Sequence, residues 1–213
     1  MQAASQGEEN RLVLVSAADV ASTAANVVGD FPLEGEEMEI ANYKVSQVSI
    51  ATLGSDTTVD VGDNFIEIGK FRLLNETTTN KDVELRAITF KNDGTAQLAD
   101  VLENVVLYVS GEQVSAETIM DGDYVTFRLD DGVQGGYVLE DGDSKIFSIR
   151  ADVVSAEDSD VINFKVDNFE DIVGVEIGTA FGVTTLYQAL ASLNGKMTTI
   201  ELKRTTLWPN WKI

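Results

Sequence analysis

The sequence contains no cysteine and no histidine in 213 residues. Without cysteine the chain has no disulfide and no thiolate metal ligand, and without histidine it has no imidazole ligand for zinc. Catalytic arrangements that pair a nucleophile with histidine, Ser-His-Asp and Cys-His, are excluded for the same reason. A pH switch based on histidine is excluded as well.

Basic residues are also scarce. Lysine and arginine number 15 against 36 acidic residues, which gives a net charge of −21 and a pI near 4.1. Binding to nucleic acid or to anionic membranes requires clustered basic residues, so we expect neither partner. No segment approaches the run of about 18 apolar residues that spans a bilayer, so we expect no membrane insertion. A chain without thiols fits a reducing cytosol or a bacterial surface protein that avoids cysteine, and the acidity favours the second, an extracellular cell-surface location.

Alternation of apolar and polar residues dominates what remains, and it predicts β-strands. The predicted strands are 43–53, 65–73, 83–90, 104–109, 124–129, 144–153 and 161–166. Gly- and Asp-rich turns such as Asp121-Gly122-Asp123 separate them. Many short strands joined in this way indicate an all-β, antiparallel immunoglobulin-like β-sandwich. In 65–73 and 83–90 the apolar phase shifts, which predicts β-bulges, the first of them beside Gly69.

Two short segments are candidate helices. Leu186–Leu193 has good helix formers and is followed by Asn194-Gly195, a plausible C-terminal cap. Asp19–Asn26 begins with a residue typical of a helix N-cap. Both segments are short enough to be extended instead.

The strand pattern divides the chain into three parts. Residues 1–55 form an N-terminal β segment, 56–183 a β-sandwich, and 184–213 a basic C-terminal tail. Leu12-Val-Leu-Val with Asp19 and Phe31 can be laid over Asn163-Phe-Lys-Val with Asp171 and Phe181. A repeat of this kind predicts that the N-terminal segment is the end of a preceding module, in which case the chain is an excerpt from a tandem array. No signal peptide is expected from Met1–Ser5, and an excerpt of a longer secreted protein would look the same.

The run Phe90-Lys-Asn-Asp-Gly-Thr-Ala, followed by Val105-Val-Leu-Tyr-Val-Ser-Gly-Glu-Gln-Val114, resembles bacterial cell-surface immunoglobulin-like modules of the adhesion-related (CARDB-like) kind. Ile68–Leu73 and Gly142–Asp152 extend this resemblance to modules of large S-layer-like proteins of candidate-phylum bacteria. It covers roughly 65–183 and rests on strand and turn patterns. The resemblance implies a β-sandwich without catalytic residues.

Acidic loops make calcium the candidate cation. Ca²⁺ takes hard oxygen ligands from carboxylates and backbone carbonyls in flexible loops. The candidate ligands lie in three such loops and are Asp121, Asp123, Asp141, Asp143, Asp158 and Asp160. The alternative is that each Asp-Gly-Asp is turn chemistry alone, with aspartate bonding the backbone and glycine supplying a positive φ.

The C-terminal tail differs in charge from the rest of the chain. Residues 184–213 carry four basic residues against one acidic residue, a net charge of +3, and they hold both tryptophans. The candidate interface residues are Lys203, Arg204, Trp208 and Trp211. They favour docking of the tail onto the acidic face of a second copy, in a homo-oligomer or lattice. In the alternative interpretation the tail folds back and closes its own sheet.

Other functions find weaker support. Carboxylate pairs for glycoside hydrolysis cannot be identified among so many acids, so we expect no enzyme. Phe71, Phe90, Phe127, Phe147 and Phe164 occupy apolar strand positions and are predicted core, which leaves few aromatics for a sugar platform. The glycosylation pattern at Asn75 is expected to be structural. The sequence therefore favours a non-catalytic structural module of a cell-surface, S-layer-like protein that assembles through sheet edges and charge complementarity, with calcium as a stabilising cation. An adhesion module or one that binds cell-wall or surface glycan is the alternative.

Overall fold

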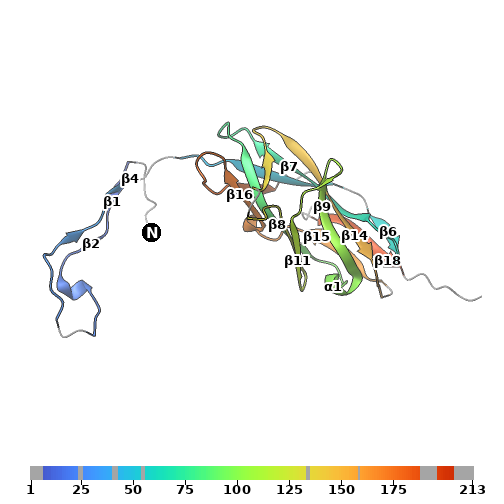
Figure 1. The fold of residues 1–213 in the computed structure, drawn as a ribbon, viewed down its shortest axis with the longest axis horizontal. Helices are drawn as coiled ribbons and strands as arrows, with labels where there is room; N and C mark the ends of the chain where they lie inside the picture. The colour runs from blue at the N-terminus through green and yellow to red at the C-terminus, as the bar shows by residue number, and fades with distance from the viewer. Residues whose placement is uncertain are drawn as a thin grey trace, which may run out of the picture. The chain divides into compact units, whose positions relative to one another are not determined.

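The computed structural model describes residues 7–23, 26–39, 43–53, 56–132, 135–157, 159–187 and 196–203. Its contacts divide the chain into an N-terminal unit, Met1–Lys44, and a sandwich unit, Val45–Ile213 (Figure 1). The boundary follows Lys44 and not residue 55 because strand β5 (Gln47–Leu53) pairs along its whole length with β7 (Ile66–Glu76). Among the described residues, no helix has the length and apolar character needed to cross a membrane.

The N-terminal unit is an antiparallel ribbon with one helical turn. Its strands are β1 (Glu9–Asn10), β2 (Val13–Leu14), β3 (Leu33–Glu34) and β4 (Met38–Glu39), with β1 paired to β4 and β2 to β3. The prediction of a helix beginning at Asp19 is wrong. The 3₁₀ turn η1 (Ala17–Asp19) ends at that residue, because the Asp19 carboxylate accepts hydrogen bonds from the amides of Val15 and Ser16, which precede it. Val20 is already extended.

The sandwich unit consists of two sheets. The six-stranded sheet has the order β10–β9–β14–β7–β5–β17, with β9 at Leu102–Val109, β10 at Glu112–Gln113, β14 at Ser144–Val153 and β17 at Thr184–Tyr187. The eight-stranded sheet has the order β11–β12–β8–β15–β18–β6, and β13 and β16 also pair with β8. Its strands are β6 (Thr57–Asp60), β8 (Val83–Asn92), β11 (Glu117–Asp121), β12 (Tyr124–Arg128), β13 (Tyr137–Leu139), β15 (Val161–Lys165), β16 (Ile172–Glu176) and β18 (Lys196–Lys203). The helical turns described are α1 (Leu98–Val101) and η2 (Phe169–Asp171).

The predicted all-β sandwich is confirmed by the core between the two sheets. Phe71 on β7 contacts Phe90 on β8 at a centroid distance of 4.9 Å, which joins one sheet to the other. Phe71 also stacks on Phe147 at 5.2 Å. All five phenylalanines predicted as core are at most 1% exposed. Burial of each stabilises the fold by about 1.5–3 kcal/mol.

The two predicted phase shifts are bulges in the sheets. Ile149 of β14 faces Gly69, and the next residue, Arg150, faces Glu67, so β7 carries one extra residue at Ile68. Glycine leaves room there for Ile149, because a Cβ at Gly69 would lie 3.1 Å from the Ile149 side chain, closer than most Cβ contacts. The second bulge lies in β8, where Val173 and Gly174 of β16 face residues on either side of Arg86.

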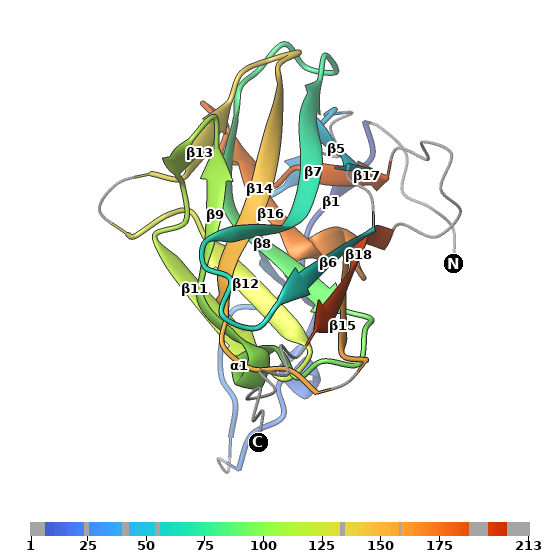
Figure 2. The ribbon, with the colours of Figure 1, turned by 90° about the vertical axis from the view of Figure 1, so that its right-hand side faces the viewer.

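The first and last strands of the sandwich unit lie side by side and run parallel. β17 pairs with β5 from Thr184 opposite Gln47, and β18 pairs with β6 from Ile200 opposite Thr57 (Figure 2). Leu186 and Tyr187 belong to β17, so the helix predicted from Leu186 does not begin there, and its remaining residues lie outside the described part. Strand β18 is not a sheet edge, because β15 pairs with its other side.

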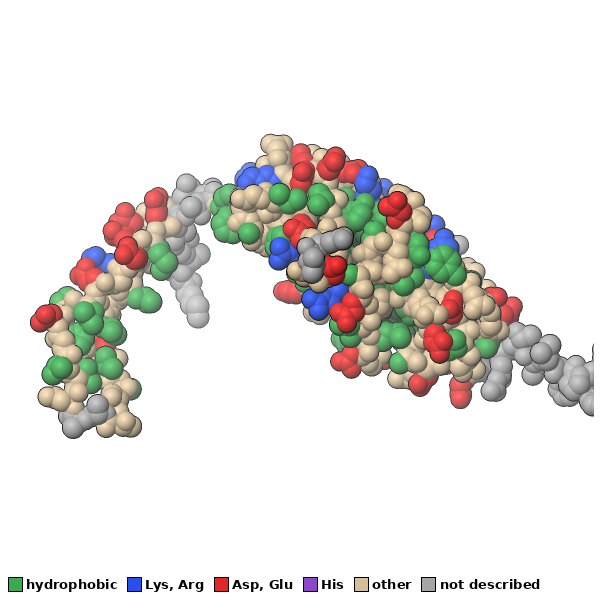
Figure 3. Space-filling view, viewed as in Figure 1, with side chains coloured by type: hydrophobic (Ala, Val, Ile, Leu, Met, Phe, Trp, Pro, Cys, Tyr) green, Lys and Arg blue, Asp and Glu red, His purple; other side chains and the backbone are tan. Residues whose placement is uncertain are grey.

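Acidic side chains are spread over the visible face of the sandwich unit, with lysine and arginine between them (Figure 3). Several aspartates shape the backbone beside them. Asp63 accepts from the amide of Asp60, and Asp130 accepts from the amide of Gly132. Part of the acidic excess therefore serves turns, as the turn interpretation of the sequence expects.

Candidate functional site

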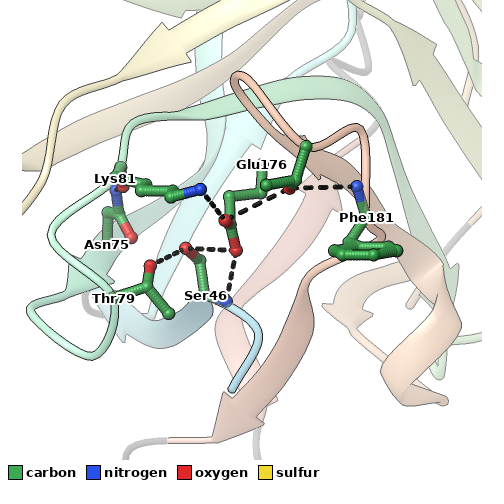
Figure 4. A network of polar contacts seen from close by, with 7 residues as sticks. Ser46, Asn75, Thr79, Lys81, Glu176 and Phe181 are labelled. Carbon is green, nitrogen blue, oxygen red and sulfur yellow. Dashed lines mark hydrogen bonds and ion pairs between the residues drawn. The ribbon is translucent and has the colours of Figure 1, made fainter. Parts of the chain in front are cut away.

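A network of buried polar groups lies at the end of the sandwich unit where β5 begins (Figure 4). Its centre is Glu176, the last residue of β16, whose side chain is fully buried. Ser46, which directly precedes β5, supplies two donors, and the β7–β8 loop supplies Thr79 and Lys81. The network thus joins three segments that are distant in sequence.

Each oxygen of the Glu176 carboxylate meets two donors. Oε1 lies 3.0 Å from Lys81 Nζ and accepts from Thr179 Oγ1 at 3.2 Å. Oε2 accepts from the Ser46 amide and from its hydroxyl, each at 3.2 Å. The Ser46 hydroxyl in turn is hydrogen-bonded to Thr79 Oγ1. A buried charge needs such partners, because an unpaired carboxylate in an apolar interior is strongly destabilising.

Asn75 holds the β7–β8 loop in the place that the network requires. Its side chain is fully buried, and Nδ2 donates to the carbonyl of Lys81 at 2.9 Å and to that of Leu139 at 3.1 Å. These bonds fix the backbone of Lys81, from which the ammonium reaches Glu176. A buried side-chain amide that donates two hydrogen bonds is not available to a glycosylating enzyme in the folded chain. The Asn75 pattern is therefore structural, as expected.

The network fastens the fold and offers no reaction site. Ser46 is 0% exposed and the Glu176 side chain is 0% exposed, so no substrate reaches either the hydroxyl or the carboxylate. Lys81 is 35% exposed, but its ammonium is paired with Glu176. A nucleophile or general acid must touch its substrate, and these groups cannot.

The predicted calcium ligands lie in separate turns. Asp121 and Asp123 are exposed and flank Gly122, whose φ of 57° forms the β11–β12 turn. In the next predicted loop, Lys145 Nζ lies 2.7 Å from Asp143 Oδ2, and this hydrogen bond holds the pKa of Asp143 below its usual value. The amide of Asp141 donates to Asp82.

The third predicted loop is also closed by its own backbone. Asp160 Oδ2 accepts from the amide of Glu157 at 2.8 Å, while Asp158 lies outside the described residues. Across 7–23, 26–39, 43–53, 56–132, 135–157, 159–187 and 196–203, no three acidic side chains converge to hold a metal ion. Calcium binding stays a prediction. The bond observed at Asp160 is one of turn chemistry, while Asp143 is paired with Lys145.

Of the predicted interface residues, the structure describes the backbone of Lys203 only. It ends β18, in register with Asp60 of β6. Arg204, Trp208 and Trp211 lie outside the described residues. The strand of the tail closes its own sheet, with Ile200 at 0% and Leu202 at 2% exposure, which is the alternative interpretation for that strand. Docking of the remaining tail on a second copy stays a prediction.

A cluster of two aromatic rings and an arginine lies on the outer face of the six-stranded sheet. The rings of Phe65 and Tyr108 meet edge to face at a centroid distance of 5.2 Å. The Arg150 guanidinium lies 4.9 Å from the Phe65 ring and 6.0 Å from the Tyr108 ring. Such contacts stabilise by about 0.5–1 kcal/mol at exposed sites. The Phe65 side chain remains 45% exposed.

Asp152 holds Phe65 in its unusual backbone conformation. Phe65 has a φ of 54°, in the left-handed region that side chains other than glycine rarely adopt. Its amide donates to Asp152 Oδ1 at 2.6 Å, and Asn104 Nδ2 donates to Oδ2 at 2.6 Å. The hydrogen bond from Asn104 and then that from Phe65 lower the pKa of Asp152. The carboxylate therefore fixes the ring position at neutral pH.

A shallow hollow of about 420 Å³ continues the same outer face. Ile146, which is 50% exposed, and Ser148 of β14 line it, together with Glu67 and Lys70 of β7. Nothing in the sequence identified this face, because Arg150 and Phe65 are 85 positions apart and only the β7–β14 pairing brings them together. Aromatic and arginine side chains beside a hollow are typical of a binding surface.

Comparison with known proteins gives no family. No family model and no curated protein matches the chain. Among solved structures, the seventh ScaB type I cohesin from Pseudobacteroides cellulosolvens aligns with a TM-score of 0.38 and 11% identity, over 79% of this chain and 97% of that chain.

Two further solved structures align at the same level. The sixth cohesin of scaffoldin B from Acetivibrio cellulolyticus, in complex with a Cel5 dockerin, has a TM-score of 0.38 and 14% identity, over 75% of this chain and 100% of that chain. AvmM, which catalyses macrocyclization in alchivemycin A biosynthesis, has a TM-score of 0.38 and 10% identity, over 76% and 92%. At these scores the likeness assigns no function to this chain.

Proposed function

We propose that this chain is a non-catalytic structural module of an extracellular, S-layer-like surface protein, built to transmit load from one end of the sandwich to the other. The observation that carries the proposal is the parallel pairing of the first and last strands, β5 with β17 and β6 with β18. Gln47 at the start of β5 faces Glu76 at the end of β7, whereas Lys203 at the end of β18 faces Asp60, in the segment that leads to the start of β7. Strand β5 therefore begins, and β18 ends, at opposite ends of the sandwich.

Tension applied at those two ends loads the paired strands in shear. The ladder hydrogen bonds between β5 and β17, which begin with the Thr184 amide donating to the Ser46 carbonyl at 3.0 Å, then share the force. Both strands are also held on their other sides, β5 by β7 and β18 by β15. The Glu176 network adds an anchor at Ser46, directly where force enters β5.

Sheet edges give less support to assembly by strand pairing. The described edge strands are short, from two residues in β10 to five in β11, and β11 begins and ends with the acidic residues Glu117 and Asp121. Short, charged edges discourage strand addition. In the proposed role, contacts between copies use charge complementarity instead, with the basic tail among the candidates.

Single-molecule pulling tests the proposal, and the absence of cysteine makes the pulling points unambiguous. Lys44→Cys with Lys203→Cys applies force end to end, in shear. Lys44→Cys with Thr77→Cys applies it at one end, where Gln47 of β5 faces Glu76 of β7, and opens that pair like a zipper. We expect a clearly higher unfolding force in the first geometry. Equal forces would show that the terminal strands bear no special load.

An adhesion or glycan-binding module is the second candidate. The observation that favours it is the cluster of Phe65, Tyr108 and Arg150 beside the hollow on the outer face. Titration calorimetry with solubilised cell-wall glycan tests it, with Phe65→Ala as the variant that removes the exposed ring. Binding that Phe65→Ala abolishes would support this candidate, and absence of binding by the unmodified chain would remove it.

A further inference from the structure

The N-terminal unit repeats the turn that joins β15 to β16. In η1, Asp19 Oδ2 accepts from the amides of Val15 and Ser16 at 2.8 and 3.0 Å. In η2, Asp171 Oδ2 accepts from the amides of Asp167 and Asn168 at 2.9 and 2.7 Å. Each of these two bonds, and the bond from the Asp19 amide to the Ser16 carbonyl, has its counterpart 152 positions later (171 − 19). Both turns carry the same capping box, and both are followed by an extended residue.

Strand register extends the correspondence beyond the turn. In the N-terminal unit the paired residues are Glu9 with Glu39, Asn10 with Met38, and Val13 with Glu34. In the sandwich unit the paired residues are Val161 with Glu201, Ile162 with Ile200, and Lys165 with Lys196. In every matched pair, the residue in the first strand and its counterpart differ by 152 positions (161 − 9), and the residue in the second strand and its counterpart differ by 162 (201 − 39).

The repeat predicted from the sequence therefore matches the structure in its first half, from residue 12 to Asp19, but not in its second half. The ribbon β1–β4 and β2–β3 corresponds to the hairpin of β15 and β18, and Phe31 does not correspond to Phe181. The backbone two residues before the first strand also agrees, since Gly7 and Ser159 have φ of 80° and 77°.

Burial separates the two copies. In the sandwich unit, Phe164 is 1% exposed and Ile172 is 3% exposed. Their counterparts in the N-terminal unit are Leu12, which is 82% exposed, and Val20, which is half-buried. Figure 3 shows hydrophobic side chains on the surface of this unit, and none of its described residues is buried. A two-stranded ribbon without a core is marginally stable in water.

We propose that residues 9–39 are the closing hairpin of a β-sandwich of this same type, and that they dock on a sandwich module that lacks its own counterpart of β15 and β18. In the sandwich unit this place is beside β8, where Phe164 faces Asn92 and Lys165 faces Lys91. Docking there would bury Leu12 and Val20 as their counterparts Phe164 and Ile172 are buried, and would partly cover Leu14 as its counterpart Val166 is partly covered. Asn10 and Arg11 depart from this pattern, because their counterparts Ile162 and Asn163 are buried.

A graft within the full chain tests whether the segment fits this place. Residues 164–172 are replaced by a copy of residues 12–20, which has the same length and keeps the aspartate of the capping box. The graft shortens the buried side chains at 164 and 172 but keeps both apolar, so we expect cooperative unfolding with a melting temperature lowered by less than about 10 °C. Hydrogen exchange should be slow in the copy at 164–172 and fast in the identical sequence at 12–20.

The matched control grafts residues 101–109, which are equally apolar but contain no capping box. We expect this control to lose cooperative unfolding. If the graft of 12–20 melts no better than the control, or if 12–20 is already protected from exchange in the unmodified chain, the proposal is overturned. Because the graft does not test load between the chain ends, this inference and the proposed function can fail separately.

Discussion

Glu176→Gln is the substitution that most directly tests how the end of the sandwich is held. A glutamine has the shape of glutamate but replaces one carboxylate oxygen with an amide that only donates. At the Oε2 position this amide would face the backbone N–H of Ser46, and at the Oε1 position it would face the ammonium of Lys81. Either orientation therefore places donor against donor inside the fold.

The cost follows from the groups left without partners. Breaking a buried ion pair by removing one partner costs about 3–5 kcal/mol. The lower end applies, because Lys81 is 35% exposed and can be hydrated when its partner is lost. About 3 kcal/mol in a unit of this size corresponds to a melting temperature lowered by about 6–12 °C.

The assay is urea and thermal unfolding of the full chain, followed by far-ultraviolet circular dichroism. Glu67→Gln is the matched control, because the Glu67–Lys70 pair has the same 3.0 Å distance but both side chains are more than a third exposed. An exposed pair of this kind contributes about 0–1 kcal/mol. If Glu176→Gln shifts the midpoint no more than Glu67→Gln does, the argument from burial is refuted.

Three further predictions concern a buried hydroxyl, a carboxylate that caps the backbone, and the acidic loops. Thr185→Val should raise the free energy of unfolding by about 1 kcal/mol, because the hydroxyl is buried and has no hydrogen-bond partner among the described residues. The control Thr126→Val loses a 2.9 Å hydrogen bond to Thr89 and should lower the free energy of unfolding by a similar amount. Equal effects of the two substitutions in thermal unfolding would contradict this prediction. Asp152→Asn should be less stable than the unmodified chain at pH 6. A carboxyl whose pKa is lowered by folding contributes stability at pH values above its unfolded pKa, about 3.9, and this contribution is lost as the pH falls through the folded pKa. The difference in stability between the unmodified chain and Asp152→Asn should therefore shrink below about pH 4 in urea titrations. A difference that stays constant with pH would disprove the role given to the Asp152 carboxylate. Millimolar calcium, compared with chelator, should raise the melting temperature, because an ion bound only by the folded chain at a hundredfold excess over Kd adds about 2.7 kcal/mol to the free energy of unfolding. An unchanged melting temperature would remove calcium from the account.

Much of the candidate site was beyond sequence reasoning. The acids of the Asp-Gly-Asp turns were visible as turn formers or ligands, but Glu176 was one acid among 36. Its burial depends on Ser46, 130 positions earlier, and on the β7–β8 loop. The cluster of Phe65 and Arg150 depends in the same way on the pairing of β7 with β14. Contacts between strands that are distant in sequence produce no periodic pattern in the local sequence from which they could be predicted.

The sequence by itself determined the sandwich, its bulges and its phenylalanine core. These features follow from alternation with a period of two, from the phase shift beside Gly69 and from turn residues, all of which act within one strand or turn. The sequence also determined the turn that recurs at Asp19 and Asp171, because a capping box forms between residues that are close in sequence. Only the tertiary structure decided that β5 and β6 run parallel to β17 and β18, and that Glu176 is buried with Lys81. Pairing between chain ends and the burial of a charge are settled by packing across the whole unit, because no turn links β5 to β17 or β6 to β18.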